Sequence, residues 1–307
     1  MAPCAVPRRR CILGLGSPPL SIVHPTIEYM FKPNQNVYRF GNHVIINEYG
    51  MRSDSFSVSK QKDEIRIMVF GDSVVNGGNL TDQNDLATEI IKRKINQQGK
   101  YKKVTVGNIS AGSWGPGNWL AYAKKYGFFN ADFIVLVTNS EDYIDNPTFA
   151  PLNKNTHPTS QPISALAEGM ERYLPQYLPN FEGEKSLLNP ENNLQLTSVA
   201  SREAQAKKGI HDLTNFLELA KKQHKPIIVI QHLKSTEVNS NKFEPGYYQI
   251  RKTCTNLEIK CISLQPYLIK TINNHLNPYR SNDKIHINAI GQRMLAEAIL
   301  DNFEPPK

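Results

Sequence analysis

From residue 65 onward, short apolar runs alternate with longer segments whose apolar residues recur at helical spacing. The apolar runs predict strands at 65–70, 103–109, 133–138, 226–233 and 260–264. The segments between and after them predict helices at 84–99, 117–127, 201–223, 245–257 and 288–303. Strands separated by helices are typical of a parallel sheet covered on both faces. The pattern therefore predicts a three-layer, doubly wound α/β domain over residues 65–303, built on a mainly parallel five-stranded sheet.

Two segments lie outside this alternation. Residues 1–64 have no sustained period, and we interpret them as an N-terminal arm packed along the domain. Residues 143–200 are rich in Pro, Asn and Ser and too long for a plain loop, so we expect an insertion over one end of the sheet, partly helical around 163–172. Its aromatic residues suit stacking on sugar rings, although anchoring the insertion to the core is the simpler explanation: Tyr143, Phe149, Tyr173, Tyr177 and Phe181.

The composition is that of a globular protein, with 39% hydrophobic and 21% charged residues in 307. The net charge of +8 comes partly from short basic runs, without an aromatic-interleaved basic stripe or zinc-finger spacing, so we expect no nucleic-acid partner. No apolar run reaches the roughly 18 residues of a membrane span, so we expect no transmembrane segment. The four cysteines form no C-x-x-C, and we expect neither a metal nor an organic cofactor. The oligomeric state stays open.

The candidate chemistry begins at "IMVFGDSVV", residues 67–75, where a buried-looking strand ends on Gly71, Asp72 and Ser73. Ligands of open α/β sheets bind at the carboxyl ends of the strands, which is where Ser73 is expected. A serine hydroxyl needs a histidine base and usually an orienting carboxylate to act as a nucleophile at neutral pH. Of eight histidines, His286 is the candidate base, because it precedes the final predicted helix and follows Asp283 by three residues.

These blocks resemble those of the SGNH (GDSL-type) hydrolase family. "IMVFGDSVVNGG" is similar to the family's first block and "DKIHINAIGQRMLAEAI" to its last, in the expected order at the two ends of the α/β region. The resemblance covers about residues 65–303 and implies a flavodoxin-like fold. It also implies Ser73 as the nucleophile, His286 as the general base and Asp283 as the residue that orients the base.

The two middle blocks match less closely. "NISAGSWGPGN" follows the second strand and contains a G-x-x-G, Gly112 to Gly115. The resemblance implies the second glycine, Gly115, as a backbone donor to the oxyanion beside the N–H of Ser73, with Trp114 as a wall of the substrate pocket. The third block departs from the family pattern: if Asp142 matches its aspartate, Glu141 stands where the donor asparagine belongs. We therefore expect Asn139 to fill that role, or the oxyanion hole to rely on two backbone donors. We expect Asp142 and Trp114 to contact the substrate.

Three functions fit these residues. The first is a serine-dependent carboxylic ester hydrolase acting through an acyl-enzyme, with a carbohydrate O-acetyl ester as the candidate substrate. The second is an O-acyltransferase with the same triad, and the third is a carbohydrate-binding member with weakened catalysis, which the Glu141 departure suggests. A flavodoxin-type nucleotide binder ranks below these, because the turn after the first strand has no G-x-G-x-x-G and no phosphate-binding lysine pattern.

The cellular location is left open by the sequence. The stretch "NEYGMRSD" in the arm looks like the lead-in of some bacterial envelope-associated members of the family, which implies a cell-envelope, periplasmic or secreted protein. The basic and apolar piece "RRRCILGLG" at 8–16 is too short and glycine-rich for a good secretory signal. A cytoplasmic location is the alternative.

Overall fold

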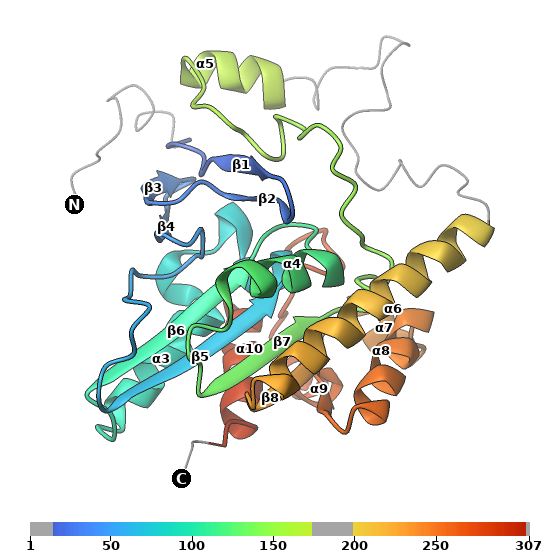
Figure 1. Ribbon diagram of the computed structural model, residues 1–307. Coiled ribbons are helices and arrows are strands. Elements are labelled where there is room, and N and C mark those ends of the chain that lie inside the picture. Colours follow the sequence, from blue (N-terminus) through green and yellow to red (C-terminus); the bar gives the residue numbers. More distant parts are fainter. Residues whose placement is uncertain (1–14, 174–198, 305–307) are drawn as a thin grey trace.

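The computed structural model describes residues 15–173 and 199–304, and its centre is a five-stranded parallel sheet (Figure 1). The strand order is β6-β5-β7-β8-β9, and every neighbouring pair is parallel. The strands are β5 (Glu64–Gly71), β6 (Lys103–Ser110), β7 (Phe133–Thr138), β8 (Ile227–Gln231) and β9 (Lys260–Ser263). This confirms the predicted doubly wound α/β fold class.

The connections place a ligand-binding position at the carboxyl end of β5. The chain passes from β5 to β6 on one side and then crosses to β7 on the other side of β5. In open α/β sheets such a reversal of strand order leaves a crevice at the carboxyl ends of the strands, where ligands bind. Ser73 follows β5 at this point.

Helices cover both faces of the sheet (Figure 1). Along β5 the side chains alternate, so that Met68 and Phe70 join the core on one face, whereas Ile67 and Val69 join the core on the other. The first core packs against α4 (Pro116–Tyr126), α6 (Val199–Lys222) and α8 (Pro245–Asn256). The second packs against α3 (Ala87–Gln97), α9 (Gln265–Asn273) and α10 (Ala289–Asp301).

The predicted arm is more ordered than the sequence pattern indicates. It contains two antiparallel hairpins, formed by β1 (Ser21–His24) with β2 (Glu28–Phe31) and by β3 (Gln35–Arg39) with β4 (Asn42–Ile46). In Figure 1 the β1–β2 hairpin lies beyond the carboxyl ends of β5 and β6. The arm thus reaches the end of the sheet where the candidate site is expected.

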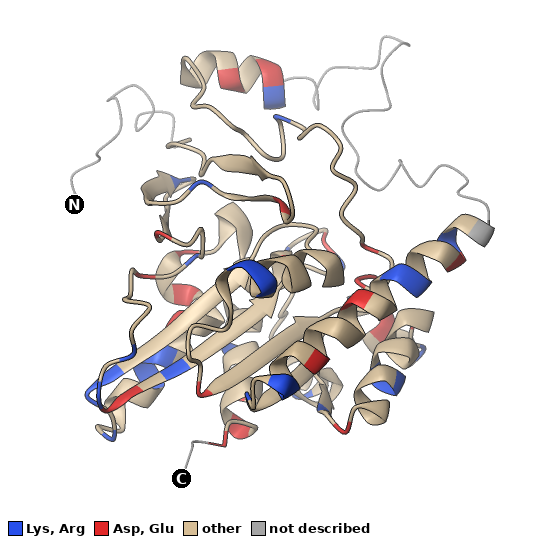
Figure 2. Cartoon of the chain, viewed as in Figure 1, with Lys and Arg blue, Asp and Glu red and all other residues tan. Residues whose placement is uncertain are grey.

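The remaining elements are short. The insertion contains α5 (Ala165–Glu168) followed by a π-helical turn, Gly169–Tyr173, which agrees with the helix expected around 163–172. The helices α7 (Ser235–Ser240) and α9 were not predicted, and two 3₁₀ turns cover Gly78–Leu80 and Gln83–Asp85. Figure 2 shows Lys and Arg interspersed with Asp and Glu along α6. Among the helices of the described ranges, none combines the length and apolarity needed to cross a bilayer.

Candidate active site

Ser73 is the first residue of a short helix, α2 (Ser73–Asn76), that begins directly after β5. The turn requires Gly71, because a Cβ on this residue would lie 2.4 Å from Val75 Cγ2. Asp72 caps the helix, since its Oδ1 accepts a hydrogen bond of 2.8 Å from the backbone N–H of Val74. Strand, glycine and cap together hold the serine hydroxyl at the carboxyl end of the sheet.

The structure brings the three residues of the predicted triad together. Ser73 Oγ lies 2.9 Å from His286 Nε2, and His286 Nδ1 lies 2.7 Å from Asp283 Oδ2. An ionised carboxylate can only accept hydrogen bonds, so Nδ1 carries the ring proton and Nε2 is free to accept from the serine hydroxyl. This is the arrangement in which an imidazole can act as a general base toward a hydroxyl.

Asp283 is held in its charged form. Burial alone would raise the pKa of its carboxyl, but hydrogen bonds from the backbone N–H groups of His286 and Ile285 and the nearby imidazole lower it overall. These two N–H groups donate to Asp283 Oδ1 at 2.8 and 2.9 Å. The backbone of the 283–286 turn therefore holds Oδ1 of Asp283 and leaves Oδ2 to accept from the imidazole.

A second histidine supports the same turn and was not singled out from the sequence. His232 is fully buried and its Nε2 lies 2.7 Å from the carbonyl oxygen of Ile285, next to His286. Burial lowers the pKa of His232 to about 4, so the ring is neutral at physiological pH and donates Nε2–H to that carbonyl. Its position directly after β8, at the same edge of the sheet as Ser73, was the available signal.

Gly115 does not face the serine. Its N–H donates a 3.0 Å hydrogen bond to Asn118 Oδ1 at the start of α4. A Cβ on Gly115 would lie 1.9 Å from the carbonyl oxygen of Asp145, so close packing explains the glycine. Its neighbour Trp114 is 1% exposed and donates from Nε1 to the carbonyl oxygen of Tyr29, which anchors the β1–β2 hairpin. Neither residue lines the cavity beside Ser73.

Asn139 and Asp142 form a buried cluster behind Asp72. Asn139 Nδ2 donates to Asp72 Oδ2 at 2.9 Å and to Asp142 Oδ1 at 2.6 Å, which uses both hydrogens of its amide. Asp142 Oδ2 accepts from the backbone N–H of Asn139 at 2.8 Å. Glu141 points away and pairs with Lys234 at 2.5 Å. The structure therefore leaves no free amide hydrogen on Asn139 and no carboxylate of Asp142 facing a substrate.

The aromatic residues of the insertion do not gather around the serine. Tyr143 is buried in the core beside Gly209 of α6 and Gly246 of α8, and Phe149 is exposed. Tyr173 accepts a hydrogen bond from Arg39 Nη2 at 2.7 Å and packs edge-on against Phe40. Tyr177 and Phe181 lie outside the described residues. Within the described ranges, Tyr143 and Tyr173 thus anchor the insertion to the rest of the chain.

A cavity of about 150 Å³ lies beside Ser73. Its floor includes Asn76, Ala111 and Gly112, and its walls come from the arm and the insertion, including Tyr29, Phe31, Arg52, His157, Pro158 and Arg172. The charged residues on this lining are arginines, since no Asp or Glu is among the described residues that form it. The arm and the insertion therefore complete the pocket that the sheet begins.

Gly112 lines the cavity beside Ser73, whereas Gly115, the glycine predicted for this place, does not. In the β5–β6 register Gly71 pairs with Ser110, so Ser73 and Gly112 each follow the last paired residue by two positions. The N–H of Gly112 has no hydrogen-bond partner among residues 15–173 and 199–304, and a Cβ at Gly112 would meet nothing within 4 Å. The equal offset from the strand ends was a signal for Gly112 that the glycine spacing alone did not provide.

Searches with known proteins gave matches only among solved structures. No protein-family model and no curated protein matches this sequence. Structures similar to it include a lipolytic protein of the G-D-S-L family from Veillonella parvula, with 14% identity and a TM-score of 0.43 over 78% of this chain and 98% of that one. The acetyl xylan esterase AlAXEase has 14% identity and a TM-score of 0.47 over 78% and 100% of the two chains.

A catalytic mutant of the acetylxylan esterase Axe2 from Geobacillus stearothermophilus is also similar, with 11% identity and a TM-score of 0.49 over 78% of this chain and 95% of that one. Identities and scores at this level do not establish a shared activity. Among the described residues, no group of three or more His, Cys, Asp or Glu side chains is placed to hold a metal ion.

Proposed function

We propose that this protein is a serine ester hydrolase of the SGNH type that acts through an acyl-enzyme. The observation that carries the proposal is the hydrogen-bonded series Ser73–His286–Asp283, in which residues 213 positions apart meet at 2.9 Å. Ser73 follows β5 at the switch point of the strand order, and His286 reaches it from the loop before α10. Triads are recognised by such geometry and roles rather than by sequence position.

The proposed reaction starts with attack of Ser73 Oγ on the ester carbonyl, while His286 Nε2 takes the hydroxyl proton. Asp283 orients the imidazole and stabilises its cationic form. The carbonyl oxygen becomes an oxyanion, and we assign the N–H groups of Ser73 and Gly112 to bind it, since both residues line the cavity and follow paired strand ends by two positions. His286 then gives the proton to the departing alcohol, and a water molecule releases the acid by the same steps. No step requires a metal or an organic cofactor.

The cavity supports a short acyl group. Ligand pockets for drug-sized molecules range from about 300 to 1,000 Å³, whereas the cavity beside Ser73 measures about 150 Å³. Phe31, Val44 and Pro158 supply apolar walls for a methyl group, and Thr156 and His157 supply polar ones. An O-acetyl ester of a carbohydrate is the proposed substrate class, with the acetyl group in the cavity and the alcohol outside it.

Hydrolysis is favoured over acyl transfer by the exposure of the base. The side chains of His286 and Asp283 are 33% and 28% exposed, so water can approach the imidazole that must activate it for hydrolysis. A transferase has to exclude water from the acyl-enzyme. An assay of acetate release with and without a sugar acceptor separates the two activities.

The test is a panel of short-chain esters and acetylated sugars, assayed with the wild type and with Ser73→Ala. We expect kcat/KM to fall by at least about 10⁴-fold in the variant, because the nucleophile is lost. The melting temperature should stay near that of the wild type, since the Ser73 hydroxyl has no hydrogen-bond partner besides His286 among the described residues. A small fluorophosphonate should label the wild type at Ser73. Equal turnover by the two proteins would remove Ser73 from the mechanism.

A further inference from the structure

We propose that Asn76 donates the side-chain hydrogen bond to the oxyanion, in place of the asparagine at the end of β7. The proposal rests on the ester hydrolase function above and names a further catalytic residue for it. It follows from three properties of Asn76: its position on α2, the fixed orientation of its amide, and the amide hydrogen that its own contacts leave unused.

The need for another donor comes from Asn139. Both hydrogens of its amide are bonded, one to Asp72 and one to Asp142. Turning either toward a substrate would leave a buried carboxylate with one donor fewer, which is costly because Asp72 and Asp142 are 5% and 2% exposed. Asn139 is therefore fixed as a bridge between two carboxyl groups.

Asn76 shares a helix face with Ser73. The two residues are the first and last of α2 and are three positions apart, so their side chains project from the same side of the helix. Asn76 is 4% exposed and lines the same cavity as Ser73 and Gly112. The amide thus lies within the site and has almost no contact with bulk solvent.

The orientation of this amide is determined by its neighbours. The backbone N–H of Gly78 donates to Asn76 Oδ1 at 3.2 Å, and an N–H group can only donate. The nitrogen is therefore Nδ2 on the opposite side, where it donates to the carbonyl oxygen of Ser110 at 3.2 Å. Among residues 15–173 and 199–304 this is the one hydrogen bond that Asn76 Nδ2 donates, so its second hydrogen stays available.

The three proposed donors converge from only two strands. Ser110 ends β6, and Gly112 follows it by two residues, so the bond from Asn76 to Ser110 ties the amide to the chain that carries the Gly112 N–H. Ser73 and Asn76 both follow β5. The oxyanion hole is thus built between β5 and β6, while the end of β7 supplies structural support through Asn139.

The experiment compares Asn76→Ala with Asn42→Ala. Asn42 Nδ2 donates to the carbonyl of Asn79 and so anchors the same loop, but Asn42 does not line the cavity. With p-nitrophenyl acetate we expect kcat to fall by about 10²- to 10³-fold in Asn76→Ala, with KM changing by less than about threefold, and little change in Asn42→Ala.

A tetrahedral inhibitor separates donation from loop support. For Asn76→Ala, we expect the inhibition constant of a small alkylboronic acid to rise in parallel with the loss of kcat/KM, since the boronate oxygen occupies the oxyanion position. A purely structural role would instead raise the KM of the ester about as much as the inhibition constant of the boronate, because a distorted site binds the ground state and the tetrahedral analogue equally poorly. That outcome would overturn the proposal, as would a kcat within about threefold of the wild type.

Asn139→Ala supplies the opposite pattern. Fluorophosphonate labelling counts the active sites of this variant. We expect its melting temperature to be lower than that of the wild type. We expect its kcat per labelled site to fall less than that of Asn76→Ala. A larger loss of kcat per site in Asn139→Ala would overturn the assignment to Asn76. A wild type that is neither labelled nor active would overturn the hydrolase function itself and this proposal with it, so the two failures are distinguishable.

Discussion

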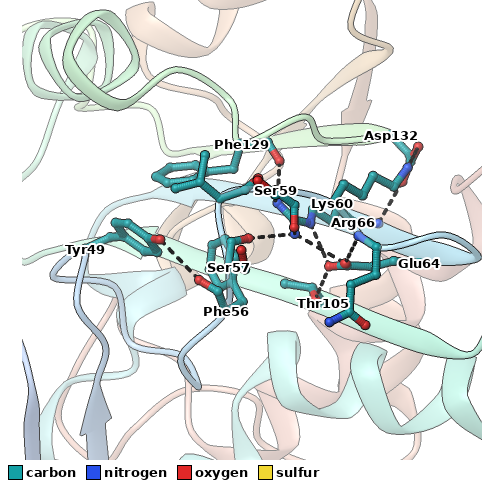
Figure 3. A network of polar contacts seen from close by, with 12 residues as sticks. Tyr49, Phe56, Ser57, Ser59, Lys60, Glu64, Arg66, Thr105, Phe129 and Asp132 are labelled. Carbon is teal, nitrogen blue, oxygen red and sulfur yellow. Dashed lines mark hydrogen bonds and ion pairs between the residues drawn. The ribbon is translucent and has the colours of Figure 1, made fainter.

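The two ends of β5 handle buried charge in opposite ways. At the amino end, Arg66 and Glu64 are fully buried and paired, with Nε donating to Oε1 at 2.6 Å (Figure 3). The guanidinium also donates to four backbone carbonyls, those of Ser57, Val58, Ser59 and Phe129. Every donor of this side chain therefore has an acceptor, and the cluster joins the segment before β5 to the loop after α4.

At the carboxyl end the buried groups are acids without a bonded cation. Asp72 and Asp142 share Asn139, and within the described ranges no Lys or Arg side chain bonds to either. Burial raises the pKa of both carboxyls, and the nearby Asp72 raises the pKa of Asp142 further. The comparison teaches that complete pairing marks the structural end of the strand, whereas under-compensated acids lie beside the proposed nucleophile Ser73, as perturbed groups tend to do at functional sites.

The largest expected effect on stability comes from removing the buried cation at the amino end of β5. Arg66→Met should lower the free energy of unfolding by about 3–5 kcal/mol, because it leaves Glu64 buried without its cation. The measurement is urea unfolding at pH 7. The double variant Arg66→Met, Glu64→Gln should recover part of the loss, since it removes the uncompensated charge.

The matched control is a pair at the same end of the sheet that lies on the surface. Lys102 and Asp63 are 3.1 Å apart with side chains 80% and 44% exposed, so Lys102→Met should change the free energy of unfolding by less than about 1 kcal/mol. If Arg66→Met and Lys102→Met destabilised the protein equally, full pairing would not distinguish the amino end of β5.

The next prediction concerns the pH dependence of the free energy of unfolding, to which Glu64 and Asp145 contribute with opposite signs. Burial would raise the pKa of Glu64, but hydrogen bonds from Arg66, Gln61 and Thr105 lower it to about 2, so its contribution is complete above about pH 4.5 and is lost as pH falls toward 2. Burial and the nearby Asp72 raise the pKa of Asp145 to about 7. The contribution of Asp145 is complete below about pH 4 and is lost as pH rises through 7.

Asp145→Asn tests the second sign. Asp145 is partly exposed, and water screens its interactions, so we expect the variant to be more stable than the wild type by about 2 kcal/mol at pH 8 and equal to it at pH 4. The measurement is urea unfolding at the two pH values. An equal gain in the free energy of unfolding at both pH values would show that repulsion among the acids at the carboxyl end of β5 does not destabilise the protein.

The sequence predicted the elements whose patterns are long and strongly apolar. β5, β7 and α6 were found within a few residues, because their periods are sustained and their ends carry clear signals. The hairpins of the arm were not found, since strands of four or five residues with mixed burial show too little alternation to exceed chance. α9 was missed because it begins at Gln265, directly after a short strand, without an intervening loop.

For the site, local motifs predicted the residues that meet in the triad but not those around them. Ser73 and the Asp283–His286 pair lie in blocks whose spacing fixes their local geometry. The proposed oxyanion donors depend on the β5–β6 register and on which amides are already bonded, and neither can be read along one chain segment. The contacts of Gly115 and Asn139 are made with residues of other elements, so their unavailability appears only in three dimensions.

The smallest effect concerns a hydroxyl near the acidic end. Tyr29 is 5% exposed and its hydroxyl has no hydrogen-bond partner among the described residues, while burial and nearby carboxylates raise its pKa. Tyr29→Phe should therefore stabilise the protein by up to about 1 kcal/mol, because it removes an unsatisfied buried group. Tyr122 is equally buried but donates to the carbonyl of Tyr49 at 2.9 Å, so Tyr122→Phe should cost about 1 kcal/mol. Thermal and urea unfolding of the two variants measure the signs; a loss of stability in Tyr29→Phe would mean that this hydroxyl is satisfied and that the carboxyl end of β5 is as well compensated as the amino end.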